Sequence, residues 1–271
     1  MRTLFILLNS FLFANAYNIL AVFPHEGKSH QMIFGPIIRE LARKGHTLTV
    51  LVHYSFKENS DGYREILLKD PNSAGQDVFS LDYFDLPVTF YQLLSAYNLV
   101  WEGLSSCECL LSNENVRTLI QSDEKFDLII AEFFNSECSQ LFVDKFKAPL
   151  VGVSSTTLMP WHTDRLATPD NPSYIPNNHF WNTNRMDFSE RIVNTLGVFY
   201  YKMIYCFYLN SNKYLLEKYS GHEMPDLEMM MKNTSLLLVN SHFSLSFSRP
   251  MVPGVQEIGG VHITQPKTLP K

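Results

Sequence analysis

The sequence predicts an α/β domain built on a doubly wound parallel sheet with helices on both faces. Three observations support this fold class. Apolar runs of strand length recur along the chain and fit strands that are buried on both sides of a parallel sheet. Stretches with helical spacing alternate with these runs. The chain has 271 residues, of which 45% are hydrophobic, with a formal net charge of −5. That composition allows a packed core and argues against disorder.

The first elements form a β-α-β unit. "YNILAVF" at residues 17–23 is an apolar run of strand length, and "HTLTVLV" at residues 46–52 is a second one. Between them, apolar residues from Ile33 onward recur at helical spacing, and Lys44 followed by Gly45 provides a stop. Pro36 is expected in or near the first turn, where its missing N–H matters least. The unit implies a right-handed crossover between parallel strands.

The same alternation continues downstream. "VTFYQLLSAYNLVWEGL" predicts a helix that is apolar on much of its surface, and "SNENVRTLIQ" predicts another with Ser112 as its N-cap. Residues 126–132 ("FDLIIAE") predict a strand, "SECSQLFVDKF" a helix and "APLVGVS" a further strand. These elements extend the same parallel sheet.

Residues 155–190 differ, because they hold several prolines, many asparagines and few apolar runs. We expect a long surface excursion there, and such loops in compact domains are often functional. A helix is expected from about residue 189 to 219, "TSLLLVNS" predicts a late strand, and "PGVQEIGGVHI" predicts a short one.

The N-terminus has the features of a secretory signal peptide. "MRTLFILLNSFLFANA" combines Arg2, an apolar run and Ala14-x-Ala16, so we expect cleavage after Ala16 and a mature chain in the secretory pathway. The four cysteines allow three pairings of two disulfides, and their spacing selects none. Unpaired, half-buried cysteines are the favoured expectation. No basic patch is apparent, which argues against nucleic acid as a partner.

Two polar residues lie where ligands bind in such sheets, beyond the carboxyl ends of strands. His30 follows the strand at 17–23, and Glu132 terminates the strand at 126–132. If the strands are neighbours, the carboxylate holds the imidazole, which then acts as a general base. The alternative is a polar loop histidine and a solvated glutamate. His25, His46 and His53 are given structural roles.

Four further residues are candidates for substrate binding. Gly27 and Ser29 lie in the "GKSH" loop before a helix, whose N-terminal N–H groups favour phosphate. Ser154 and Ser155 end the "APLVGVS" strand. The loop matches no dinucleotide-binding or P-loop motif, the chain has no G-x-S-x-G hydrolase motif, and the cysteines show no metal-ligand spacing.

Several segments together resemble the UDP-glycosyltransferases of animals, most closely those of insects. They are "NILAVFPHEGKSHQMIFGPIIRELARKGHTLTVL", "FDLIIAEFFNSECSQLF", "PLVGVSS" and "LLLVNSHFSLSFSRPMVPGVQEIGGVHI", in the order of the family. The family has two doubly wound α/β domains that face each other across a cleft, and this chain resembles the first, acceptor-binding half.

The resemblance implies a mechanism. The histidine at the position of His30 takes a proton from the acceptor hydroxyl, and the oxygen then attacks the UDP-sugar with inversion. A carboxylate orients the histidine; the family often has Asp where this chain has Glu132. The resemblance further implies a small lipophilic acceptor, a UDP-sugar co-substrate, and neither a cofactor nor a metal.

The resemblance also sets the expected boundaries. Residues 17–258 form the acceptor-binding domain, and residues 259–271 begin the interdomain linker. The donor-binding domain, the membrane helix and the basic tail of the family are expected to be missing. The full-length form is therefore expected in the endoplasmic reticulum, anchored only by that helix.

Two alternative functions remain. One is a catalytically silent module that binds a lipophile or associates with full-length transferase chains. The other is an unrelated luminal hydrolase that uses His30 and a carboxylate.

Overall fold

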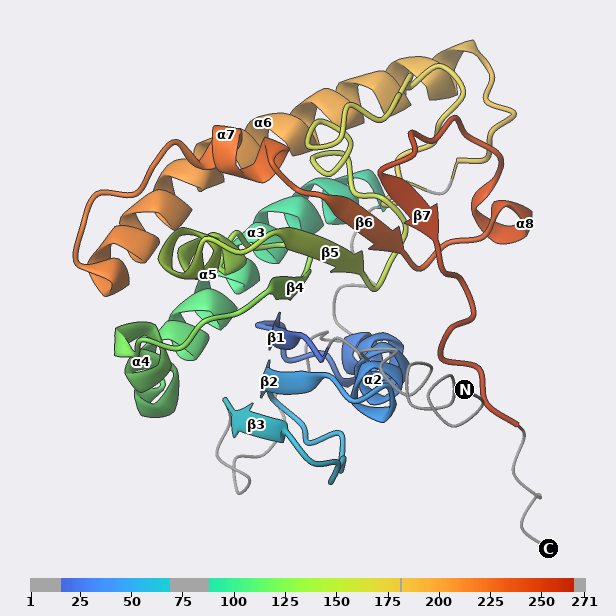
Figure 1. The fold of residues 1–271 in the computed structure, drawn as a ribbon. Coiled ribbons are helices and arrows are strands. Elements are labelled where there is room, and N and C mark those ends of the chain that lie inside the picture. The colour runs from blue at the N-terminus through green and yellow to red at the C-terminus, as the bar shows by residue number, and fades with distance from the viewer. Residues whose placement is uncertain (1–15, 69–87, 181, 266–271) are drawn as a thin grey trace, which may run out of the picture.

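The computed structural model describes residues 16–68, 88–180 and 182–265 (Figure 1). The predicted signal peptide, apart from Ala16, lies outside these residues, as does the end of the predicted linker. The strands of the structure are β1 Asn18–Val22, β2 Thr47–Val52, β3 Tyr63–Leu67, β4 Leu128–Glu132, β5 Leu150–Ser154, β6 Leu236–Val239 and β7 Val255–Glu257. The helices are α2 Lys28–Arg43, α3 Val88–Ser112, α4 Glu114–Gln121, α5 Ser139–Phe146, α6 Phe188–Ser220, α7 Leu227–Lys232 and α8 Phe243–Ser246.

The strands form one parallel sheet in the order β3-β2-β1-β4-β5-β6-β7. Side chains along β1 alternate between two cores, as the pleat of a strand requires. Ile19 and Ala21 pack with apolar residues of α2, whereas Leu20 and Val22 pack with residues of α3, α4 and α5 on the other face. Figure 1 shows α2 and the pair α4 and α5 on opposite sides of the sheet. The predicted doubly wound fold is confirmed.

The strand order reverses direction between β1 and β4. The chain runs outward from β1 to β3 on one side, and then from β4 to β7 on the other. Ligands in open α/β sheets bind at such a switch point, beyond the carboxyl ends of the strands. Val22 pairs with Ala131 near the ends of β1 and β4, so the loops that follow these strands start side by side.

Three helix predictions need correction. Helix α2 begins at Lys28, directly after Gly27, so Pro36 lies in its interior rather than near its first turn. Pro36 therefore leaves the carbonyl of the fourth residue before it without the usual helical N–H partner. The N-cap of α4 is Asn113, whose side chain accepts from the N–H groups of Asn115 and Val116, and Ser112 belongs to α3. The predicted helix at 88–104 continues to Ser112, because one helical turn follows another without a breaking residue.

The expected excursion at residues 155–190 is present as a long run of turns with many exposed residues, but it is not confined to the surface. The segment consists largely of turns, and within it the side chains of Trp161, His162 and Arg165 are buried. Hydrogen bonds to neighbouring elements hold parts of the segment inside. Trp161 donates its indole N–H to the carbonyl of Phe134, and Asn194 of α6 donates to two carbonyls of the segment. The segment is part of the wall around the end of β4.

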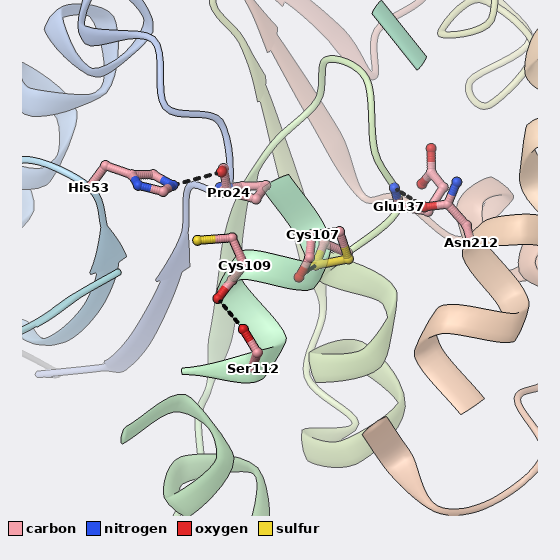
Figure 2. Close-up of a disulfide and its surroundings, with 8 residues drawn as sticks. Pro24, His53, Cys107, Cys109, Ser112, Glu137 and Asn212 are labelled. Carbon is pink, nitrogen blue, oxygen red and sulfur yellow. Dashed lines mark hydrogen bonds between the residues drawn. A yellow bond between two sulfur atoms is a disulfide. The ribbon is translucent and has the colours of Figure 1, made fainter. Parts of the chain in front are cut away.

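The expectation of unpaired cysteines is wrong for Cys107 and Cys138, which form a disulfide (Figure 2), whereas Cys109 and Cys206 are not in a disulfide. Helix α3 places Cys107 over the N-terminus of α5, where Cys138 is the N-cap, and the two Cα atoms are 5.4 Å apart. The two cysteines are 31 positions apart, so the spacing of cysteines in the sequence does not reveal the pair. The bond ties α3 to the loop that leaves β4.

A second contact fixes the same loop. Asn135 donates its side-chain amide to the carbonyl of Leu99 in α3, at 2.8 Å. Gly103 of α3 lies so close to this loop that a Cβ there would overlap the carbonyl of Asn135. The glycine is needed for close approach, and together these contacts set the position of the residues after Glu132.

Candidate active site

His30 occupies the first turn of α2, immediately beyond the end of β1. Gly27 is the N-cap with extended backbone, and the N–H of His30 donates to the carbonyl of Gly27 at 3.0 Å. This short connection leaves the imidazole over the carboxyl edge of the sheet. The His30 side chain is 13% exposed, so the ring is held but reachable.

Glu132 is the last residue of β4 and contacts His30 directly. Its Oε1 lies 2.6 Å from Nδ1 of His30, and its Oε2 accepts from the backbone N–H of His25 at 3.3 Å. The carboxylate is 1% exposed. The expected meeting of the two side chains is present because β1 and β4 are neighbours. Their catalytic roles stay predictions.

The two serines at the end of β5 behave differently from one another. Ser155 places its hydroxyl 2.8 Å from Nδ1 of His30, the same nitrogen that contacts Glu132. Ser154 is fully buried, and its hydroxyl lies 3.5 Å from that of Thr156. The structure therefore brings Ser155, but not Ser154, to the imidazole. This position points to orientation of His30 rather than to a direct contact with substrate.

Two aromatic rings hold the imidazole from the sides. The His25 ring centre lies 4.2 Å from that of His30, and the Phe134 ring meets His30 edge-on at 4.5 Å. Burial lowers the pKa of His25 to about 4, although the nearby Glu132 carboxylate opposes the shift. His25 is thus a neutral ring near neutral pH, and it places no like charge beside His30. Sequence reasoning missed Phe134, although the aromatic pair after Glu132 was a signal.

Gly27 and Ser29 both lie at the start of α2, directly before His30. A Cβ on Gly27 would come within 2.9 Å of Nε2 of His25 and 3.1 Å of Cδ2 of His30. Gly27 therefore allows the two rings to approach each other. Ser29 is exposed in the first turn of α2, and no side chain caps that turn.

The arrangement fixes which nitrogen of His30 is available for chemistry. Nδ1 faces Glu132 and Ser155, so a proton on Nδ1 is shared with the carboxylate. Among the described residues, none contacts Nε2 in a hydrogen bond. In this tautomer Nε2 carries a lone pair that can accept a proton from a bound hydroxyl. The geometry is that of a general base with an orienting carboxylate.

A buried polar network supports the loop behind the site. Glu137 accepts from Arg165 and from the hydroxyl of Tyr205, and the Arg165 guanidinium lies 4.4 Å from the centre of the Phe133 ring. Burial raises the pKa of Glu137, although the Arg165 cation opposes that shift. The network joins residues 133–137 to the 155–190 segment and to α6. Spacing alone gave no signal for it.

Fold and site together define a class: a doubly wound α/β domain with a histidine–carboxylate pair at the switch point of its sheet. The family model described as "UDP-glucoronosyl and UDP-glucosyl transferase" matches residues 18–271. The chain belongs to this family. It is thus a transferase by family, as the sequence resemblance indicated.

Named relatives agree with this assignment. UDP-glucosyltransferase 2 of Dactylopius coccus is 34% identical over 95% of this chain and 50% of its own length. UDP-glycosyltransferase UGT5 of the same organism is 33% identical over 98% and 52%, and UDP-glucuronosyltransferase 3A1 of Bos taurus is 26% identical over 98% and 51%. The chain spans about half the length of these relatives.

Among solved structures, the calicheamicin glycosyltransferase CalG4 superposes on 90% of this chain and 53% of its own, with a TM-score of 0.48 at 16% identity. The family assignment stands on the sequence match.

Proposed function

We propose that this chain is the acceptor-binding half of an enzyme that transfers a hexose from a UDP-sugar to a hydroxyl group of a small lipophilic molecule. The observation that carries the proposal is the 2.6 Å contact between Nδ1 of His30 and Glu132 at the switch point of the sheet. The family assignment supplies the reaction class, and the site supplies the group that activates the acceptor.

The proposed reaction proceeds with inversion. Nε2 of His30 accepts the proton of the acceptor hydroxyl while its oxygen forms a bond to the anomeric carbon of the sugar. The bond from that carbon to the diphosphate breaks, and UDP leaves with the electron pair. Glu132 stabilises the imidazolium that forms, and Ser155 helps to hold the ring.

The UDP-sugar is proposed to bind mainly to the part of the relatives that this chain does not span. Stabilisation of the leaving diphosphate is usually a large catalytic contribution, and its donors would lie there. We therefore propose that the 271 residues alone do not transfer sugar at a measurable rate. The lumen of the endoplasmic reticulum is the proposed location, supported by the N-terminal sequence and by a disulfide, which persists in oxidising compartments.

The proposal is tested in a version of the protein that carries the second half found in its relatives. His30→Ala should lower the turnover of a phenolic acceptor with UDP-glucose by a factor on the order of 10²–10⁴. His242→Ala, which alters an exposed histidine remote from β1 in sequence, is the matched control. Circular dichroism should show both variants folded. Near-normal turnover in His30→Ala would assign the base to another residue.

A further inference from the structure

One motif of the sequence has no part in the proposed reaction. Asn233-Thr234-Ser235 has the pattern N-x-[ST], which accepts N-linked oligosaccharides in proteins of the secretory pathway. One other asparagine, Asn171, has a serine or threonine two residues later. Pro172 follows it directly, and proline at the middle position breaks the pattern. The sequence therefore offers a single acceptor asparagine.

The structure presents the two essential groups of this motif to solvent. Asn233 and Ser235 are exposed, whereas Thr234 is buried and donates its hydroxyl to the carbonyl of Met231 at 2.7 Å. Among the described residues, none forms a hydrogen bond with the carboxamide of Asn233 or with the hydroxyl of Ser235. Only the middle side chain, whose identity the motif leaves open, is directed into the molecule.

The backbone around the motif is held without the help of the Asn233 side chain. Asn233 ends helix α7, and its N–H donates to the carbonyls of Met230 and Met231. The N–H of Ser235 donates to the carbonyl of Leu150 at 2.9 Å, which starts the pairing of β6 with β5. A group attached to the carboxamide would therefore break none of these hydrogen bonds.

The structural role of this residue does not require an asparagine. Asparagine is favoured after a helix when the backbone there is left-handed. The backbone of Asn233 has φ −84° and ψ 12°, which ordinary residues adopt. The end of α7 uses only its backbone N–H. An exposed carboxamide is thus left for another purpose.

The motif lies at the edge of the sheet opposite to His30. Ser235 contacts Leu150, the first residue of β5, whereas Ser155, which follows the last residue of β5, contacts His30. Strand β5 has five residues, so at about 3.3 Å per residue its two ends are roughly 13 Å apart. Figure 1 shows α7 leading into the tail of the β6 arrow. A large group on Asn233 would therefore leave the edge with His30 open.

We propose that Asn233 carries an N-linked oligosaccharide. The donor is a lipid-linked oligosaccharide diphosphate. The side-chain nitrogen of Asn233 forms a bond to the anomeric carbon of the donor and gives up one proton. The bond from that carbon to the diphosphate breaks, and the lipid diphosphate leaves with the electron pair. The attached group is bulky and solvated, so it fits the exposed end of α7.

The modification rests on the proposed location in the lumen of the endoplasmic reticulum, where such donors are used. The N-terminal sequence and the disulfide support that location. Within the described parts of the chain, no helix is long and apolar enough to cross a membrane.

The test is cell-free synthesis of the 271-residue chain with microsomes of the endoplasmic reticulum. Protease-protected chains should give a band of lower mobility in a denaturing gel, and endoglycosidase H should remove the shift. Asn233→Gln and Ser235→Ala should each abolish the slower band while protection remains, and Ser235→Thr, which keeps a hydroxyl, should retain it. Asn171→Gln changes an exposed asparagine of the broken pattern, so this matched control should keep the slower band.

Protected chains without a slower band would overturn the proposal, as would a slower band that persists in Asn233→Gln. Chains left unprotected would instead contradict the proposed location. Residues 17–271 placed behind the signal peptide of a secreted protein would then reach the lumen. A missing slower band in that experiment would overturn the modification by itself.

The position of the motif also predicts how the oligosaccharide affects catalysis. In the version with the second half, removal of the oligosaccharide from the folded protein should leave the turnover of a phenolic acceptor unchanged, because the oligosaccharide lies at the edge opposite to His30. A loss of turnover in a protein that stays folded would contradict this placement.

Discussion

Oε1 of Glu132 and Nδ1 of His30 lie 2.6 Å apart although the two residues are separated by 102 positions in the chain. The contact depends on two neighbouring parallel strands that end at the same level. It also depends on the length of the glutamate, whose two oxygens reach His30 and the N–H of His25 at the same time.

The charge of Glu132 is expected to matter more than its shape. Glu132→Gln keeps the shape, but its amide can donate to Nδ1 of His30 and so place the ring proton on Nε2, where it blocks proton abstraction. In the version with the second half, turnover should fall by a factor on the order of 10²–10⁴. Steady-state kinetics with a phenolic acceptor measure this. Unchanged turnover would show that Glu132 does not orient the base.

Glu132→Asp should have an intermediate effect. The charge remains, but the side chain is shorter by about 1.5 Å, one carbon–carbon bond, so it no longer reaches both His30 and the N–H of His25. The rate should lie between those of the original enzyme and Glu132→Gln. An aspartate variant slower than the glutamine variant would contradict this ranking.

Ser155 is expected to act on the rate constant rather than on acceptor affinity. Its hydroxyl contacts Nδ1 of His30, so Ser155→Ala removes one hydrogen bond that holds the ring. The loss of one such bond corresponds to roughly a fivefold decrease in kcat with little change in KM. Ser154→Ala, which alters a buried hydroxyl that lies 3.5 Å from Thr156, is the control. If Ser155→Ala raised KM and left kcat unchanged, Ser155 would instead contribute to substrate binding.

The disulfide between Cys107 and Cys138 should contribute strongly to stability. It closes a loop across 31 positions, and restriction of the unfolded chain by such a loop is worth about 3–4 kcal/mol. Replacing both cysteines by alanine should lower the free energy of unfolding in urea by about that amount. Cys206→Ala, which changes an exposed thiol, should leave the unfolding midpoint near its original value. Equal unfolding midpoints for the original chain, the double alanine variant and Cys206→Ala would show that the disulfide does not contribute to stability.

Stability should decrease on mild acidification because of buried neutral histidines. Burial lowers the pKa of His179 from 6.5 to about 4. Between these values the unfolded chain binds a proton that the folded chain does not, so the free energy of unfolding falls as pH drops from 6.5 toward 4. This group accounts for up to about 3 kcal/mol. Urea unfolding of His179→Phe should show a smaller loss over that range, and measurements above pH 6.5 isolate the change in packing. An unchanged pH dependence would show that His179 is not responsible.

Sequence patterns were sufficient for β1, β2 and β4 because strands buried on both faces read as short apolar runs. They missed β3, "YREIL", because only one of its five residues is buried and two charged residues, Arg64 and Glu65, interrupt the apolar run. His30 and Glu132 could be paired because both lie at strand ends, where the topology of a parallel sheet brings side chains together. Phe134 and the cysteine pair could not be found in this way, because their contacts depend on how α3 and the loop after β4 pack in space.

The pairing of Cys138 with Cys107 rather than with Cys109 depends on the formation of helix α3. Cys107 and Cys109 are two residues apart, so an unfolded segment would offer both thiols to Cys138 at almost the same chain distance. Residues two apart on a helix do not face the same way, and Figure 2 shows the sulfur of Cys109 directed away from the bond that Cys107 forms. Helix formation is therefore what selects one thiol over the other. Oxidation before α3 has formed would produce a mixture of the two isomers, and a disulfide isomerase would have to reopen the mispaired one.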